Sequence, residues 1–465
     1  MRDRRDFLRT TATAGLGLAL GARSLDGRPG PGAPDASAAT LGPGPLQEPL
    51  FAAPPIETVR MGFVGLGHQG VPHLENFLRI PGVEIAALCD IVSGKVEAMQ
   101  RRVVDDGRPR PAGYDRGHED FRRMCDELEL DLVFTSTPWR WHAPICIAAM
   151  ETGKHAATEI PMGVTLDELW AMVETAERTR RHCVMMENCC YDRTEMMILN
   201  MVRQGVLGEL VHAECGYLHD LRRLKLTDFY EERWRVAHSI TRNGDLYPTH
   251  GLGPVAQWMN INRGNQFDHM VSVASKGRGL NLWAAEHIGP DSPEARQHYA
   301  LGDVVTTMIR TRNDETIQVV HDTNLPRPYS RKVLLQGTRG VVRKYPEQKI
   351  HVEGISPPHR WEDLLDWRDR YEHPVWKALE ELSRGAGHGG MDYIEDYRLI
   401  QCLREGAPMD MDVYDGAAWS AVAELSEMSI AQRRVVDFPD FTRGAWRHRP
   451  PLGIVEVGDV SAATG

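Results

Sequence analysis

The chain has 465 residues, 42% of them apolar and 26% charged, so it is long enough to form two domains with sizeable cores. This composition argues against a largely disordered or membrane-embedded protein. The net charge is −11 and the body of the chain carries no dense basic stripe, so we expect no nucleic-acid partner.

The amino terminus predicts an export signal. The paired residues Arg4 and Arg5 precede a small, mildly apolar stretch that ends at Ala22. This pattern is typical of a twin-arginine signal over residues 1–22, and the stretch is too short for stable membrane insertion. An ordinary basic terminus followed by a short helix is the alternative. We therefore expect export to a periplasmic or extracellular location, with a Pro/Gly/Ala-rich linker over residues 23–55.

The eight cysteines indicate neither a redox motif nor a zinc site. They include the adjacent pair Cys189 and Cys190 but no C-x-x-C pair and no zinc-type spacing. We expect most of them to be reduced and buried, and we expect no metal, although a structural disulfide stays open at this point.

A glycine-rich turn predicts a dinucleotide site. Residues 59–64 predict a strand and residues 71–79 a helix. Between them lies the G-x-G-x-x-G motif of Gly65, Leu66, Gly67, His68, Gln69 and Gly70. In such motifs the first glycine permits the tight turn, the second lets the backbone approach the pyrophosphate, and the third allows close helix packing. The helix amino terminus supplies N–H groups for the phosphates.

An acidic residue after the next predicted strand completes the motif. Residues 83–88 predict that strand, and Asp90 follows it, about 20 residues after the last glycine, where a carboxylate can accept hydrogen bonds from the adenosine ribose. The pattern therefore predicts a Rossmann domain over residues 56–188 that binds NAD in preference to NADP.

The later strands of this domain end at further candidate residues. Residues 130–135 predict a strand that leads to Trp139 and His142, which either contact the cofactor or pack. Glu159 follows a strand at 155–158 and either orients the nicotinamide or its ribose or acts as an acid. The βα alternation continues to Asn188, which we include among the cofactor contacts.

These motifs resemble the Gfo/Idh/MocA family of oxidoreductases. The resemblance is carried by GLGHQG, by T-P-x-x-x-H ending at His142, by GKHAATEIP, and by the segment Thr249 to Pro254. It implies an α/β fold in which the Rossmann domain is followed by an α+β domain with an open, mainly antiparallel sheet. We expect that domain at residues 189–440, followed by a tail at 441–465.

Two departures narrow the resemblance. Ile160 stands where many dehydrogenases of the family have a catalytic lysine, and Leu246 stands where inositol dehydrogenases have aspartate. With W-R-W-H, M-E-N-C-C-Y and G-H-G-G-M-D-Y, they make the chain similar to glycoside hydrolase family 109, whose characterised activity is alpha-N-acetylgalactosaminidase. The resemblance implies active-site positions at Glu159, Tyr191, Arg235, Tyr247, His250 and Tyr329.

The resemblance also implies a mechanism that uses NAD without net redox change. The sugar would be oxidised at C3, lose its C1 substituent by elimination, add water and be reduced again. We expect His250 to act at the C3 hydroxyl and Tyr247 at C2, both facing one pocket from a helix that begins near Thr249, although the sequence does not divide their roles. Glu159 and Tyr191 are the other catalytic candidates, Arg235 and Tyr329 are expected to bind the sugar, and His388 to line the same pocket.

Two other functions stay open. One is an NAD-dependent sugar dehydrogenase of the same fold, which the missing lysine argues against. The other is a non-catalytic sugar-binding relative, which Tyr247 and His250 argue against. In each case the partner is a small carbohydrate, and a homo-oligomer stays open because the second domain often pairs through its sheet in this family.

Overall fold

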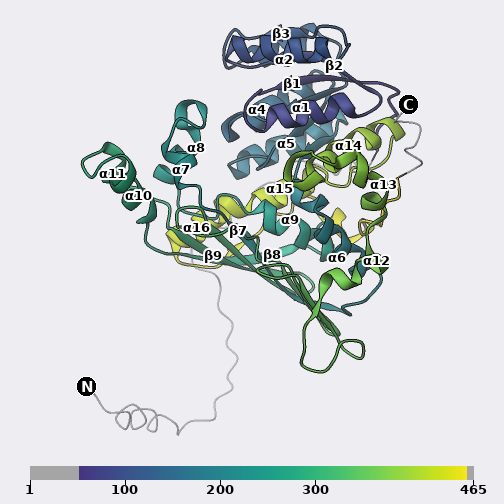
Figure 1. The fold of residues 1–465 in the computed structure, drawn as a ribbon, viewed down its shortest axis with the longest axis vertical. Coiled ribbons are helices and arrows are strands. Elements are labelled where there is room, and N and C mark those ends of the chain that lie inside the picture. Colours follow the sequence, from purple (N-terminus) through teal and green to yellow (C-terminus); the bar gives the residue numbers. More distant parts are fainter. Residues whose placement is uncertain (1–51, 458–465) are drawn as a thin grey trace, which may run out of the picture. The chain divides into compact units, whose positions relative to one another are not determined.

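The structure is a computed structural model that describes residues 52–457 (Figure 1). The predicted signal at 1–22 and most of the predicted linker lie outside the described residues. In the part that is described, no helix is both long and apolar enough to cross a membrane.

The first domain is a six-stranded sheet in the order β3-β2-β1-β4-β5-β6, with every neighbouring pair parallel. Its strands are short and mostly buried, as expected for a parallel sheet covered by helices on both faces. The strands are β1 (Val59–Val64), β2 (Val83–Cys89), β3 (Ala112–Tyr114), β4 (Leu132–Thr135), β5 (His155–Thr158) and β6 (Cys183–Met185). The helices are α1 (Gly70–Arg79), α2 (Ser93–Asp105), α3 (Asp120–Glu127), α4 (His142–Glu151) and α5 (Leu166–Thr179).

The second sheet has nine strands in the order β14-β13-β12-β11-β7-β10-β9-β8-β15. Only β7 and β10 run parallel, so the predicted open, mainly antiparallel sheet is confirmed. The strands are β7 (Leu210–Leu218), β8 (Phe267–Ala274), β9 (Val304–Thr311), β10 (Thr316–Asp322), β11 (Leu334–Gly337), β12 (Gly340–Arg343), β13 (Lys349–Val352), β14 (Glu362–Asp363) and β15 (Val436–Asp437).

Helices cover one face of this sheet toward the Rossmann domain (Figure 1). Helix α9 (Thr249–Trp258) packs on β7 so closely that a Cβ on Gly251 would lie 2.3 Å from the backbone nitrogen of Gly216. Beside it lie α15 (Val413–Ser420), which reaches α5 and β6, and α16 (Val422–Gln432), which covers β8. Only Ala421 separates these two helices. The others are α6 (Arg193–Arg203), α7 (Arg222–Leu226), α8 (Trp234–Thr241), α10 (Gly279–His287), α11 (Pro293–Arg296), α12 (Arg368–Tyr371) and α13 (Pro374–Ser383).

One late helix returns to the first domain. Helix α14 (Met391–Glu405) packs against α1, and its Tyr393, Leu399 and Ile400 share a hydrophobic cluster with Phe63 and Phe77. Residues of α14 therefore complete the core of the Rossmann domain, although residues 189–440 were predicted to form the second domain.

Candidate active site

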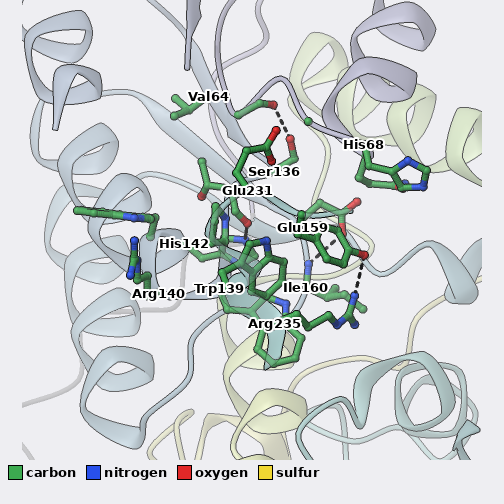
Figure 2. Close-up of a pocket in the computed structure, with 18 of the residues that line it drawn as sticks. Val64, His68, Ser136, Trp139, Arg140, His142, Glu159, Ile160, Glu231 and Arg235 are labelled. Carbon is green, nitrogen blue, oxygen red and sulfur yellow. Dashed lines mark hydrogen bonds between the residues drawn. The ribbon is translucent and has the colours of Figure 1, made fainter. Parts of the chain in front are cut away.

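A cavity opens where the carboxyl ends of β1, β2, β4 and β5 face α8 and the start of α9. This is the edge of a doubly wound sheet where ligands bind. Figure 2 shows His68, Ser136 and Glu159 from the Rossmann domain around the same space as Glu231 and Arg235 from the second domain. Of the predicted site residues, the cavity lining includes Gly65, Gly67, His68, Gln69, Asp90, Trp139, His142, Glu159, Asn188, Arg235, Tyr247, His250 and His388.

The glycine loop fits a dinucleotide. Gly65 has a φ of 91°, and a Cβ on Gly70 would lie 2.1 Å from the carbonyl oxygen of Gly65, so both positions require glycine. A Cβ on Gly67, by contrast, would meet nothing within 4 Å. Open space beside Gly67, directly before the amino terminus of α1, is what a pyrophosphate needs.

Asp90 ties the glycine loop to the next strand. Its Oδ2 accepts a hydrogen bond from the backbone N–H of Leu66 at 2.7 Å, and its Oδ1 accepts one from the N–H of Val92 at 2.9 Å. Each oxygen keeps a second lone pair for a ribose hydroxyl. The carboxylate thus lines the cavity in a fixed orientation at the end of β2, as the NAD prediction requires.

His142 supports the loop that carries Trp139. Its ring nitrogens face the carbonyl oxygens of Pro161 at 2.7 Å and Thr137 at 2.8 Å. Burial lowers the pKa of this histidine, and the two carbonyl oxygens oppose that shift because each can accept a ring N–H. Trp139 itself stacks on Tyr247, with ring centroids 5.6 Å apart.

A polar cluster lies where α14 meets the cavity. Asn188 donates to Asp392 Oδ1 at 2.7 Å, and His388 Nδ1 lies 2.8 Å from Asp392 Oδ2. Gln69 also points toward this carboxylate. The hydrogen bond with Asp392 raises the pKa of His388.

The strongest acid–base pair joins α9 to the segment after β6. His250 Nδ1, in the first turn of α9, lies 2.7 Å from Oε1 of the fully buried Glu187. Burial would raise the pKa of Glu187, but the charge and hydrogen bond of His250 hold that pKa below its ordinary value. The Nε2 edge of His250 has no hydrogen-bond partner within residues 52–457, so it is open to a ligand in the cavity.

Arg235 is surrounded by aromatic rings. Its guanidinium lies 4.8 Å from the ring centroid of Tyr247 and 5.2 Å from that of Trp139, with Trp234 and Tyr230 slightly farther away. Its Nη1 donates to the hydroxyl of Tyr230 at 3.2 Å (Figure 2). No carboxylate of the described chain pairs with it, so further N–H donors are left for a ligand.

Two residues that contact His250 were not predicted from the sequence. Tyr217, one residue before the end of β7, has its ring centroid 4.6 Å from that of Tyr247 and 5.3 Å from that of His250. No sequence pattern distinguishes Tyr217 from an ordinary inward-facing strand residue. The other is Glu187, whose signal was available because it follows a strand directly before Asn188.

Three expectations need correction. Tyr191 is buried away from the cavity, where its hydroxyl donates to Asp410 at 3.1 Å, so its predicted catalytic position is wrong. Tyr329 is 39% exposed and contacts the ring of Tyr217 edge-on at the rim, outside the cavity lining. Tyr247 faces the same cavity as His250, as predicted, but it precedes α9 instead of lying in its first turn.

One group of side chains has donor atoms close enough for a metal ion. Atoms of Glu187, Cys189 and His250 lie within 4.8 Å of one another. The guanidinium of Arg331, however, donates to the sulfur of Cys189 at 2.6 Å. Because the charged Arg331 side chain already binds this sulfur, we assign no metal to the site.

Comparisons with known proteins match both halves of the chain. A family described as "Oxidoreductase family, NAD-binding Rossmann fold" matches residues 59–187, and one described as "Glycosyl hydrolase 109, C-terminal domain" matches residues 191–448. A protein from Shewanella sp. strain MR-4, named glycosyl hydrolase family 109 protein 1, is 44% identical over 97% of this chain and 98% of its own. A protein from Shewanella oneidensis, named alpha-N-acetylgalactosaminidase, is 43% identical over the same shares.

Solved structures share the fold at lower identity. A levoglucosan dehydrogenase in complex with NADH has a TM-score of 0.66 at 21% identity, over 82% of this chain and 100% of the other. The similarity extends across both domains.

Proposed function

Because this chain belongs to glycosyl hydrolase family 109, and is an enzyme with an NAD-binding Rossmann domain, we propose that it hydrolyses alpha-N-acetylgalactosaminides or related glycosides. The observation that carries the proposal is the Glu187–His250 pair at the cavity, combined with Ile160 where a dehydrogenase of this fold would have lysine.

His250 is the proposed base for the C3 hydroxyl of the sugar. Because the buried Glu187 carboxylate accepts the Nδ1 proton, the free Nε2 is an acceptor that faces the cavity. The carboxylate also stabilises the imidazolium that forms when Nε2 takes the hydroxyl proton. Ile160, where many dehydrogenases of the family have lysine, cannot exchange a proton.

Tyr247 is the proposed partner for the proton at C2. Burial raises the pKa of Tyr247, so it begins as a neutral phenol, and the charge of Arg235 opposes that effect. The guanidinium over its ring stabilises the phenolate whenever the phenol gives up its proton. Arg235 also keeps N–H donors for an oxygen of the sugar, such as that of an acyl group.

NAD would be held by the loop of Gly65, Gly67 and Gly70 and by Asp90, and when bound it supplies reversible oxidation of a secondary alcohol. A ketone at C3 acidifies the neighbouring C2–H bond. Once Tyr247 has given its phenol proton to solvent, the phenolate, which Arg235 stabilises, removes the C2 proton, and the C1 substituent leaves with a proton from solvent. Water then adds at C1. The same side chain returns a proton to C2.

Hydrolysis in heavy water tests this proposal. Direct displacement at C1 never breaks the C2–H bond, whereas a cycle through a C3 ketone must break it and draws the replacement from solvent. We expect deuterium at C2 of the released sugar by mass spectrometry. Fast cleavage with only hydrogen at C2, and with a C2 deuterium label retained in H₂O, would overturn the mechanism.

The competing function is a net sugar dehydrogenase. It would release NADH in proportion to substrate consumed, whereas the hydrolase releases glycan fragments with no accumulated NADH. The ratio of NADH formed to glycoside cleaved distinguishes the two.

We also propose export by the twin-arginine route to the periplasm or beyond, on the strength of Arg4, Arg5 and the apolar stretch that follows. Replacing both arginines by lysine should retain the protein in the cytoplasm, as cell fractionation would show. Unchanged export would contradict the proposal.

A further inference from the structure

Behind the glycine loop, a buried histidine joins two carboxylates. His73 lies on α1 and its side chain is 1% exposed. Its Nδ1 lies 2.8 Å from Asp396 Oδ1 on α14, and its Nε2 lies 2.9 Å from Oε1 of Glu159. Asn76, one turn along α1, donates to the other oxygen of Asp396 at 2.9 Å.

The hydrogen bonds restrict where the protons lie. Asp396 accepts from Asn76 and faces His73 Nδ1, so Nδ1 carries a proton. One more proton lies between His73 Nε2 and Glu159 Oε1, while Glu159 Oε2 accepts the backbone N–H of Ile160. The other ionisable groups around the ring are Asp392 and Glu395 on α14, and His388 before that helix.

This surrounding charge favours an imidazolium. Burial alone would lower the pKa of His73, but the charge of Asp396, and then the hydrogen bonds with Asp396 and Glu159, raise it well above its ordinary value. Burial also raises the pKa of Glu395, which favours its neutral form. Because a carboxylate oxygen faces each ring nitrogen, we assign the proton between His73 and Glu159 to His73.

Glu159 connects this cluster to the site. Its side chain is 17% exposed and lines the cavity at the end of β5, whereas His73 does not reach the cavity. We propose that His73, clamped by Asp396, is a positioning residue that fixes Glu159 at the cavity wall as a carboxylate. Glu159 then serves as a fixed negative charge and acceptor for the cofactor or sugar, instead of as the general acid.

The inference rests on the proposed function, because it assigns Glu159 to that site, but part of its test needs no substrate. In ¹⁵N-histidine NMR of the full chain, we expect one ring that keeps both nitrogens protonated at pH 8.5 and disappears in His73→Gln. In Asp396→Asn this ring should lose its second proton at a lower pH. If no histidine stays doubly protonated at pH 8.5, the inference is wrong even if hydrolysis is established.

Activity supplies the second arm. Because His73 acts through Glu159, His73→Gln and Glu159→Gln should each lower kcat/KM by about tenfold or more, and their effects should not add. The double variant should therefore resemble Glu159→Gln alone. His182→Gln, which removes another buried histidine outside the cavity, should leave kcat/KM unchanged.

Additive losses of kcat/KM in the double variant would reduce His73 to a packing residue. If His73→Gln does not fold, Asp396→Asn carries both arms, since it keeps the ring and removes its charged partner. An unchanged NMR titration and an unchanged kcat/KM in that variant would likewise overturn the inference.

Discussion

Oε1 of Glu187 lies 2.7 Å from Nδ1 of His250, although 63 residues separate the two in the chain. Replacing Glu187 by Gln removes the anion that orients the ring, and an amide N–H toward Nδ1 would favour the wrong tautomer. We expect kcat to fall by about 10²-fold or more, with a smaller change in KM. Glu177→Gln, which disturbs a carboxylate paired with Arg443 outside the cavity, is the matched control and should retain activity. Equal effects of the two substitutions would remove Glu187 from the mechanism.

Tyr247→Phe should separate the two proton transfers. His250 and Glu187 stay intact in this variant, so oxidation at C3 is still supported, but exchange at C2 loses its phenol. On mixing with substrate, we expect the absorbance of bound reduced nicotinamide to rise while product release slows. Tyr217→Phe keeps the neighbouring ring and tests the specificity of the effect. Normal C2 exchange in Tyr247→Phe would assign that proton to another group.

The purified protein should carry tightly held NAD, and Asp90→Ala should weaken its retention. The lost hydrogen bonds are charge-assisted and each contributes about 1.5–3 kcal/mol, which corresponds to roughly 10- to 100-fold in Kd. The nicotinamide nucleotide released on denaturation measures this directly. Asp131→Ala removes a similar carboxylate-to-backbone bond, to the N–H of Arg60, outside the cavity lining and should retain NAD. Equal loss in both variants would contradict a specific ribose contact.

Buried neutral histidines should destabilise the fold in mild acid. Burial lowers the pKa of His155 to about 3 and the pKa of His182, His238 and His373 to about 4. Below pH 6.5 the unfolded chain binds these protons and the folded chain does not. Each histidine therefore lowers the free energy of unfolding by about 1.4 kcal/mol per pH unit until its folded pKa is reached. His73 and His388, whose pKa is raised, act in the opposite direction.

His182→Gln isolates one such proton. Between pH 7 and pH 5, its free energy of unfolding should fall by about 2 kcal/mol less than that of the unchanged chain. Denaturant unfolding at the two pH values measures the difference. If the free energy of unfolding falls equally in both proteins, His182 is protonated in the folded state as readily as in the unfolded state.

Sequence reasoning succeeded where the signal is local. The turn from Gly65 to Gly70 lies between a strand and a helix that periodicity predicts, and Asp90 follows the next predicted strand. Their positions could therefore be predicted from spacing. His250 and Arg235, by contrast, were predicted from the family resemblance and not from a local pattern.

The parts that sequence reasoning missed depend on tertiary packing. His73 and Asp396 are 323 residues apart and meet only because α14 returns to α1. Tyr191 was assigned from the family resemblance, but the short helix Asn188–Tyr191 directs its ring inward to Asp410.

All eight cysteines are buried and unpaired, as expected, which leaves no disulfide in this fold. Burial raises the pKa of Cys125 to about 11 and that of Cys402 to about 12, so these thiols form little of the thiolate that oxidants attack. The folded chain therefore needs no disulfide-forming catalyst to reach this structure.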